Sequence, residues 1–137
     1  MADTAPRLYL VTLPGRDPAA DADTLAAMLA TGEIACVRLD LGPAPEEAWV
    51  AAVNALMPVC HEADVPLVVA EHHRLVGPLG LDGVHVDQSR SAIRELRKTL
   101  GSDRIVGAFG GASRHRAMTL AEQGTDYVAM GPVGETG

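Results

Sequence analysis

Carboxylate and imidazole side chains follow two short apolar segments near the middle of the sequence. Glu71 and His73 come directly after one segment, and His85 and Asp87 lie at the end of the next. Short apolar segments are typical of buried strands, and the C-terminal ends of parallel strands meet at one edge of a sheet. We therefore expect these four side chains, together with His72, to lie close together. Such a cluster can bind a metal ion or transfer protons near neutral pH.

Two interpretations of this cluster stay open on the residues alone. The first is a site that works by metal binding or by acid–base catalysis, with His73 and His85 as the candidate acid–base residues. The second is structural, with His85 as a hydrogen-bonded residue of the core and His72 in solvent. Ligand spacing across separate strands is not a specific signal, so the pattern does not choose between them.

Six short apolar segments alternate with longer segments of helical periodicity, which predicts both strands and helices. The predicted strands are Arg7–Thr12, Ile34–Leu41, Pro66–Ala70, Gly83–Asp87, Arg104–Phe109 and Thr125–Met130. The predicted helices are Ala20–Thr31, a helix that opens at Pro45, a brief helix within His72–Gly80, Ser91–Leu100 and Ser113–Gln123. Pro58 is expected to kink the second helix or to break it near Leu56, because proline lacks the N–H that a helix interior needs.

The alternation of strands and helices predicts an α/β fold with a parallel sheet covered by helices. Two architectures fit this order, a doubly wound sheet and a (β/α)8 barrel. No Gly-x-Gly-x-x-Gly follows the first predicted strand, so a dinucleotide-binding sheet has no support.

Composition excludes several classes of protein. The chain has 137 residues, with 18 acidic against 11 basic side chains and a net charge of −7, which argues against nucleic-acid and anionic-membrane partners. Cys36 and Cys60 form no CxxC pair, so we expect no structural zinc site. We also expect no secretory signal and no membrane span, and we therefore expect a cytoplasmic protein.

Four sequence segments form a pattern whose order and spacing are specific. They are Leu8–Thr12 (LYLVT), Leu81–Gln88 (LDGVHVDQ), Ile105–Gly107 (IVG) and Gly124–Val133 (GTDYVAMGPV). Together they resemble the thiamine-phosphate synthase family and its thiazole-tautomerase relatives, over roughly Arg7 to Thr136. The resemblance implies a (β/α)8 barrel of the TIM type. It also implies that residues 1–137 are a single barrel domain without the last two of eight β/α units. Either the chain is incomplete, which we expect, or something else covers the open sheet edges.

The resemblance also implies a transferase activity in thiamine biosynthesis. The family's synthase joins an aminopyrimidine pyrophosphate to a thiazole phosphate, releases pyrophosphate and uses Mg²⁺ to stabilise the leaving group. Carried over to this sequence, Glu71 falls at a metal-binding position. The residues expected to contact substrate are Arg38, Asp87, Gly110, Gly111, Gly131 and Thr136.

Several family positions carry a different residue in this sequence. By spacing, the family's Gln-x-Arg-x-Lys positions fall on Val37, Leu39 and Leu41. Arg38 is then one residue out of phase and faces the other side of the strand, although a slipped alignment that turns Arg38 inward stays open. Arg90 stands at a metal-binding Asp, and Phe109 stands at a Ser that contacts pyrophosphate. We therefore expect a poor thiamine-phosphate synthase, or a protein without that activity.

Two alternative functions remain beside the synthase. One is an isomerase of the thiazole-tautomerase type, which needs an acid–base histidine and no Mg²⁺. The other is a non-catalytic protein that binds a phosphorylated small molecule. All three predict a phosphorylated small molecule as the partner, and a homo-oligomer is left open.

Overall fold

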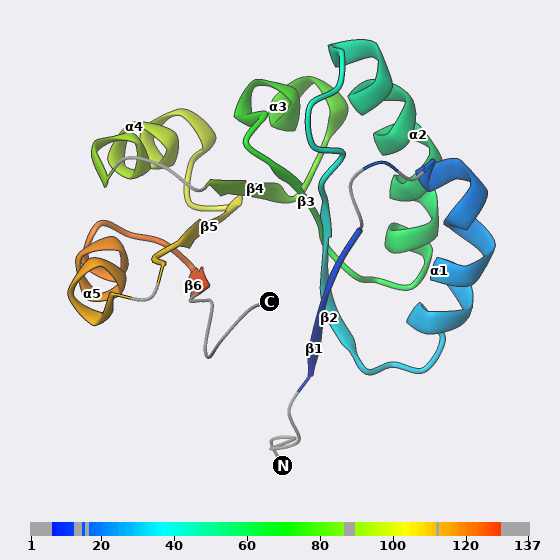
Figure 1. Ribbon diagram of the computed structural model, residues 1–137, viewed down its shortest axis with the longest axis horizontal. Coiled ribbons are helices and arrows are strands. Elements are labelled where there is room, and N and C mark those ends of the chain that lie inside the picture. The colour runs from blue at the N-terminus through cyan, green and yellow to red at the C-terminus, as the bar shows by residue number, and fades with distance from the viewer. Residues whose placement is uncertain (1–6, 13–14, 16, 87–89, 112, 130–137) are drawn as a thin grey trace. The chain divides into compact units, whose positions relative to one another are not determined.

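The computed structural model of the chain describes residues 7–12, 15, 17–86, 90–111 and 113–129 (Figure 1). Strands and helices alternate along this part of the chain, as the sequence predicts. The strands are β1 (Leu8–Val11), β2 (Ile34–Leu39), β3 (Leu67–Ala70), β4 (Gly83–Val86), β5 (Ile105–Phe109) and β6 (Tyr127–Ala129). The helices are α1 (Ala22–Leu29), α2 (Glu46–Glu62), α3 (Val76–Leu79), α4 (Arg90–Leu100) and α5 (Arg114–Glu122). Short 3-10 helices precede α1 and α3 at Pro18–Asp21 and His73–Leu75.

The strands follow one another in the sheet in chain order, β1-β2-β3-β4-β5-β6. The pairs β1–β2, β4–β5 and β5–β6 are parallel, so the predicted parallel arrangement in sequence order is confirmed. Parallel neighbours need a crossover connection, and the helices between the strands provide it.

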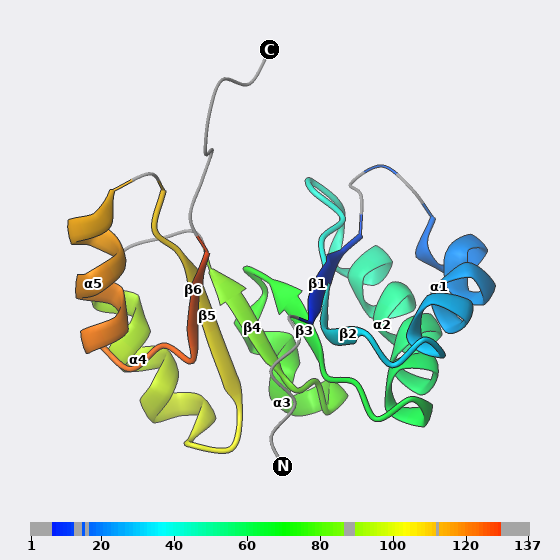
Figure 2. The same ribbon diagram turned by 90° about the horizontal axis from the view of Figure 1, so that it is seen from below.

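The chain divides into two compact units, Met1–Val68 and Val69–Gly137. In the first unit, α1 and α2 lie on one side of β1 and β2 (Figures 1 and 2). On β2, Val37 and Leu39 are fully buried at 0% exposure. The buried face of α2 consists of Trp49, Ala52, Val53, Leu56 and Cys60. An aliphatic layer between helices and strands therefore holds this unit together.

Helix α2 continues through Pro58 to Glu62, so a break near Leu56 is wrong, while the alternative of a kink stays a prediction. Proline removes one helical hydrogen bond, but burial favours an intact helix here. Leu56 and Cys60 lie on either side of Pro58, and they are 1% and 0% exposed. Tertiary packing along the whole helix thus outweighs the local cost of Pro58.

In the second unit, α4 and α5 lie on one side of β5 and β6 (Figure 2). Val84, Val106 and Ala108 are 0% exposed on that side, together with Ile93 of α4. Side chains alternate along a strand, so the intervening residues face the other side of the sheet. That side carries His85 of β4 and Tyr127 of β6.

The remaining element boundaries agree with the sequence to within a few residues. Ser113 caps α5 as predicted, because its hydroxyl accepts a hydrogen bond from the Arg116 N–H at 3.1 Å. Asp87 and Met130, which the sequence places at the ends of β4 and β6, lie outside the described residues.

Candidate active site

Glu71 directly follows β3, at the C-terminal end of the strand. Its backbone has a φ of +65°, in the left-handed region that a non-glycine residue adopts at a cost of about 1–2 kcal/mol. Its N–H donates to the carbonyl oxygen of His85 at 2.9 Å, which ties this residue to β4. The side chain is exposed. Strained residues of this kind gather at functional sites, so the geometry supports Glu71 as a candidate.

His73 follows two residues later and begins the short helix His73–Leu75. Its N–H donates to the Glu71 carbonyl oxygen at 2.8 Å, and its side chain is exposed. The backbone contacts of Glu71 thus connect it to both predicted acid–base residues, His73 and His85. The backbones of these three residues are therefore adjacent, and a shared site formed by their side chains stays a prediction.

His85 differs from His73 because it is buried, at 5% exposure. Its Nδ1 lies 2.8 Å from the hydroxyl oxygen of Tyr127. The two rings also stack, with centroids 5.6 Å apart and an interplanar angle of 17°. His85 is therefore a hydrogen-bonded residue of the sheet, as the structural interpretation holds, while its role in chemistry stays a prediction.

Tyr127 is a candidate residue that the sequence reasoning missed. His85 is in register with Gly107 on β5, and Gly107 is in register with Tyr127 on β6. A Cβ atom on Gly107 would collide with the Tyr127 ring, so the missing side chain lets the ring reach across β5 to His85. The available signal was a glycine in a strand interior, which marks a close approach of another group.

The two glycines after β5 differ from each other. The Gly110 N–H donates to the Ala129 carbonyl oxygen at 2.7 Å, so this N–H is used inside the sheet. The prediction that Gly110 presents its N–H to an anion is therefore wrong. Gly111 has a φ of +63°, and no described residue lies within 4 Å of the position that its Cβ would occupy. Its contact with an anion stays a prediction.

Arg38 lies on β2 in the first unit. By register, Tyr9 lies beside Cys36 and Val11 beside Arg38, so these side chains share one face of the β1–β2 pair. The guanidinium carbon of Arg38 lies 5.7 Å from the centroid of the Tyr9 ring. Its Nε atom is buried and has no hydrogen-bond partner among the described residues.

Three predicted substrate contacts, Asp87, Gly131 and Thr136, lie outside the described residues, and so does the side chain of Arg90. Within the described ranges, no group of three or more His, Cys, Asp or Glu side chains could hold a metal ion. Glu71, the predicted metal-binding residue, is among the described residues and has an exposed side chain. In the same part of the chain, no helix has the length and apolar character that crossing a membrane requires.

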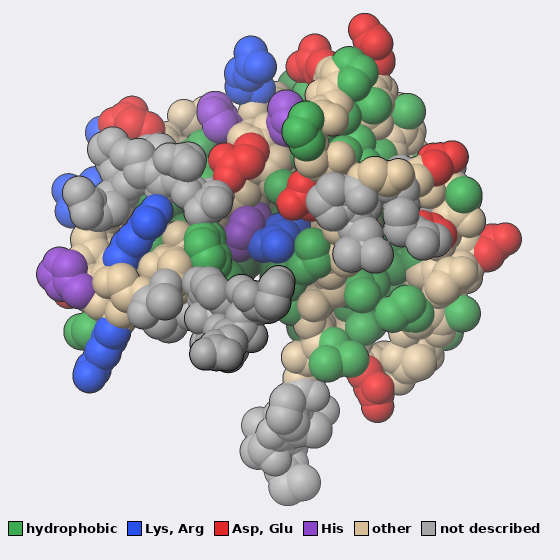
Figure 3. Space-filling view, in the orientation of Figure 1, with side chains coloured by type: hydrophobic (Ala, Val, Ile, Leu, Met, Phe, Trp, Pro, Cys, Tyr) green, Lys and Arg blue, Asp and Glu red, His purple; other side chains and the backbone are tan. Residues whose placement is uncertain are grey.

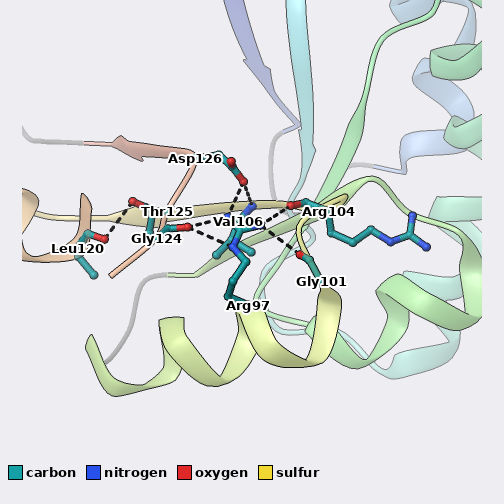
Figure 4. A network of polar contacts seen from close by, with 8 residues as sticks. All are labelled: Arg97, Gly101, Arg104, Val106, Leu120, Gly124, Thr125 and Asp126. Atoms are coloured by element: carbon teal, nitrogen blue, oxygen red, sulfur yellow. Dashed lines mark hydrogen bonds and ion pairs between the residues drawn. The ribbon is translucent and has the colours of Figure 1, made fainter. Parts of the chain in front are cut away.

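A polar network lies at the opposite, N-terminal ends of β5 and β6 (Figure 4). One Asp126 oxygen accepts hydrogen bonds from the Val106 N–H and from Arg97, both at 2.8 Å. Arg97 also donates to the carbonyl oxygens of Gly124 and Arg104. In barrels, residues at the N-terminal ends of the strands usually stabilise the fold, and catalytic residues lie at the C-terminal ends. Gly124 and Asp126 of the sequence pattern therefore have a structural role.

Comparison with known proteins identifies the family. The family model described as thiamine monophosphate synthase matches residues 8–137. The chain belongs to the thiamine monophosphate synthase family. It is 47% identical over 131 residues to the thiamine-phosphate synthase of Rhodospirillum centenum, and 36% identical over 141 residues to that of Hyphomonas neptunium. Each alignment covers 96% of this chain, but 63% and 64% of the respective relatives. The chain therefore spans a little under two thirds of their length.

A solved structure of a thiamine phosphate pyrophosphorylase from Pyrococcus furiosus resembles this fold, with a TM-score of 0.78 and 20% identity. The match covers 96% of this chain and 62% of that one. This likeness shows the fold, and the predicted class is confirmed as a partial barrel of the TIM type. The described residues include six of its strands.

In the thiamine monophosphate synthase family, polar residues on the second strand contact the substrate, so the faces of β2 can be compared with those positions. By spacing, Val37 and Leu39 fall at the family's polar positions, but both are buried at 0% exposure. Arg38 lies on the other face of the strand, because side chains alternate along it. That Arg38 takes the family's arginine position through the slipped alignment stays a prediction.

Proposed function

We propose that the chain acts as a thiamine-phosphate synthase in thiamine biosynthesis. In this reaction a transferase joins an aminopyrimidine pyrophosphate to a thiazole phosphate and releases pyrophosphate. The observation that carries the proposal is the 47% identity to the Rhodospirillum centenum synthase across 96% of this chain. The partners are then phosphorylated small molecules, and the protein acts in the cytoplasm.

Arg38 suits the anionic leaving group of this reaction. A guanidinium is always charged, and its fork of N–H donors matches phosphate oxygens. Its buried Nε has no hydrogen-bond partner within the described part of the chain, and a phosphate oxygen would satisfy that donor. Gly111, in the second unit, is a separate candidate for an anion contact, because the described residues leave open space beside its backbone.

Glu71 would hold Mg²⁺. Mg²⁺ usually takes one or two protein carboxylates and fills its other positions with water and phosphate oxygens, so one exposed carboxylate at a strand end fits this ion. When bound, Mg²⁺ supplies charge neutralisation at the oxygens of the departing pyrophosphate. Glu71 then fixes the position of that charge relative to β3 and β4.

The rate is expected to be low for two reasons that the sequence supplies. Phe109 offers no hydroxyl where the family has a Ser, and Arg90 carries the opposite charge to the family's Asp. Losing one electrostatic contact to the transition state typically costs about a hundredfold to a thousandfold in rate. Arg38 as a substrate contact weakens the case for complete inactivity.

The test incubates the protein with both substrates and Mg²⁺ and follows pyrophosphate release. Slow release that requires both substrates supports the proposal. Binding of both substrates without release would replace the synthase with a non-catalytic binder. Turnover at about 1 per second or faster would contradict the expected low rate while keeping the synthase assignment.

Glu71→Gln tests the metal position, and Asp64→Asn is its matched control. Both residues are exposed acids with a left-handed backbone, with φ values of +65° and +59°. We expect Glu71→Gln to lower pyrophosphate release about a hundredfold or more and to raise the Mg²⁺ concentration that half-saturates it. Asp64→Asn should leave both unchanged. Equal effects of the two substitutions would remove Glu71 from the site.

A further inference from the structure

His85, which is buried, and Tyr127, which is half-buried, form a pair that the proposed reaction does not yet use. They belong to β4 and β6, which are not neighbours in the sheet, and the ring of Tyr127 passes over Gly107 of β5 to reach His85. The contact joins a specific atom, Nδ1, to the Tyr127 hydroxyl at 2.8 Å. A stack at 17° holds the two rings nearly parallel.

The chemistry of the two groups decides which atom carries the proton. A phenol with a pKa of about 10 stays protonated at neutral pH, and neutral imidazole has one nitrogen that donates and one that accepts. The phenol O–H is the better donor, and the bare imidazole nitrogen is the better acceptor. The favoured arrangement is therefore a hydrogen bond from the Tyr127 O–H to Nδ1 of His85. The proton of the neutral ring is then on Nε2.

We propose that Tyr127 is a positioning residue that fixes His85 in the Nε2–H tautomer, so that His85 serves its ligand as a hydrogen-bond donor and not as a general base. A neutral ring held in this way has no lone pair on Nε2 with which to accept a proton. The chemistry that His85 would recognise is an acceptor atom of a phosphorylated heteroaromatic substrate, such as a phosphate oxygen or a ring nitrogen. The tautomer itself is independent of the proposed function, whereas the contact with substrate rests on it.

This inference separates two functions that the sequence leaves open. An isomerase of the tautomerase type needs a histidine that takes up and returns a proton. A synthase needs donors that bind and orient charge. A fixed Nε2–H tautomer at His85 fits the second requirement.

Nitrogen NMR on the intact chain tests the tautomer without any activity. The chain has five histidines, so ¹⁵N-histidine labelling gives a readable spectrum, and His85→Gln assigns the signals of His85. In the unsubstituted protein, at a pH where the imidazole ring is neutral, we expect a protonated Nε2 and an unprotonated Nδ1. Tyr127→Phe should turn this single form into a mixture of both tautomers. Tyr9→Phe alters the other tyrosine of the chain and should leave the His85 signals unchanged.

A protonated Nδ1 in the unsubstituted protein would overturn the proposal, and so would an unaltered His85 spectrum in Tyr127→Phe. Because the first outcome needs no substitution, the proposal stays testable even where a variant folds poorly.

Pyrophosphate release from the two substrates tests the role as a donor. Gln carries an N–H that can replace the Nε2 donor, so His85→Gln should keep kcat/KM within about tenfold, the value of one ordinary hydrogen bond. His85→Leu has no donor and should lose more, chiefly through KM. A general base would instead lose about a hundredfold to ten-thousandfold in kcat in both variants, which would overturn the donor role. If the unsubstituted protein releases no pyrophosphate, the synthase proposal fails while the tautomer result stands.

Discussion

The carboxylate of Asp126 stabilises the second unit by joining a strand to a helix. Its Oδ2 accepts the N–H of Val106, a residue at 0% exposure, and the guanidinium of Arg97. The ion pair is only partly shielded, because the side chains of Arg97 and Asp126 are 24% and 48% exposed. The ionic attraction therefore contributes little, and the hydrogen bond to a buried N–H contributes most.

Asp126→Ala is expected to lower the free energy of unfolding by about 1–3 kcal/mol, because the Val106 N–H loses its partner. Urea unfolding followed by circular dichroism measures this change. Glu95→Ala is the control, since the Glu95–Lys98 pair is 3.9 Å apart and both side chains are about three quarters exposed. That control should change stability by less than about 0.5 kcal/mol. Equal losses would mean that the network in Figure 4 has no special role.

Gly107→Ala should destabilise the protein by about 1–3 kcal/mol, because the added methyl group overlaps the Tyr127 ring. The cost should shrink when Tyr127 is already Ala, and a double-mutant cycle measures this coupling. Gly77→Ala is the control at a helical glycine with open space around it, and it should be neutral or slightly stabilising. If the effects of Gly107→Ala and Tyr127→Ala are additive, contact with the Tyr127 ring is not the reason why position 107 requires glycine.

At this scale, the sequence predicted residue types better than residue contacts. The positions of Glu71 and His73 after β3 follow from where an apolar segment ends. The contact between His85 and Tyr127 depends on the register of three strands, which a pattern of single residues does not contain. The facing of Arg38 depended on a shift of one residue, and such a shift moves a side chain to the other face of a strand.

The elements themselves were predictable in kind and order, because each strand and helix carries its own periodicity. The boundaries of the elements were less predictable. For example, β2 ends at Leu39 and not at Leu41. Pro58 is the clear failure at this scale. Local propensity argued for a break, while burial on both sides of Pro58 keeps α2 continuous.

Pro58→Ala tests the balance between propensity and packing in α2. Alanine restores one backbone hydrogen bond inside the helix, but it also makes the unfolded chain more flexible. We expect a net gain of about 1 kcal/mol, seen as a higher urea midpoint. Pro45→Ala is the control at the N-cap of the same helix, where proline breaks no helical bond. There only the unfolded chain changes, so we expect a small loss, and a gain at Pro45 as large as at Pro58 would contradict the explanation.

Charge is distributed unevenly over the whole molecule. Residues 1–68 contain ten acidic and three basic side chains, whereas residues 69–137 contain eight of each. The first unit therefore carries the full net charge of −7. Figure 3 shows acidic side chains around the margin of the α1 and α2 region. Like charges at this density repel one another and oppose the compact state.

Glu62→Lys should stabilise the protein, because it lowers this repulsion and places a cation in the last turn of α2, where the helix dipole favours it. We expect a gain of about 0.5–1 kcal/mol at low salt. Glu46→Lys makes the same change in net charge in the first turn of the same helix, where the dipole favours an acid. It should give no gain or a loss.

Salt separates the two contributions, because raising NaCl from about 0.1 M to about 1 M shortens the screening length from about 10 Å to about 3 Å. The unsubstituted protein should gain stability over this range as the repulsion is screened. Both lysine variants should gain less, since each has already lost part of that repulsion, and urea unfolding at the two salt concentrations measures the difference. If both variants raise stability equally at low salt, net charge alone controls the first unit. If salt changes the stability of all three proteins equally, charge repulsion within the first unit does not contribute to the stability of the protein.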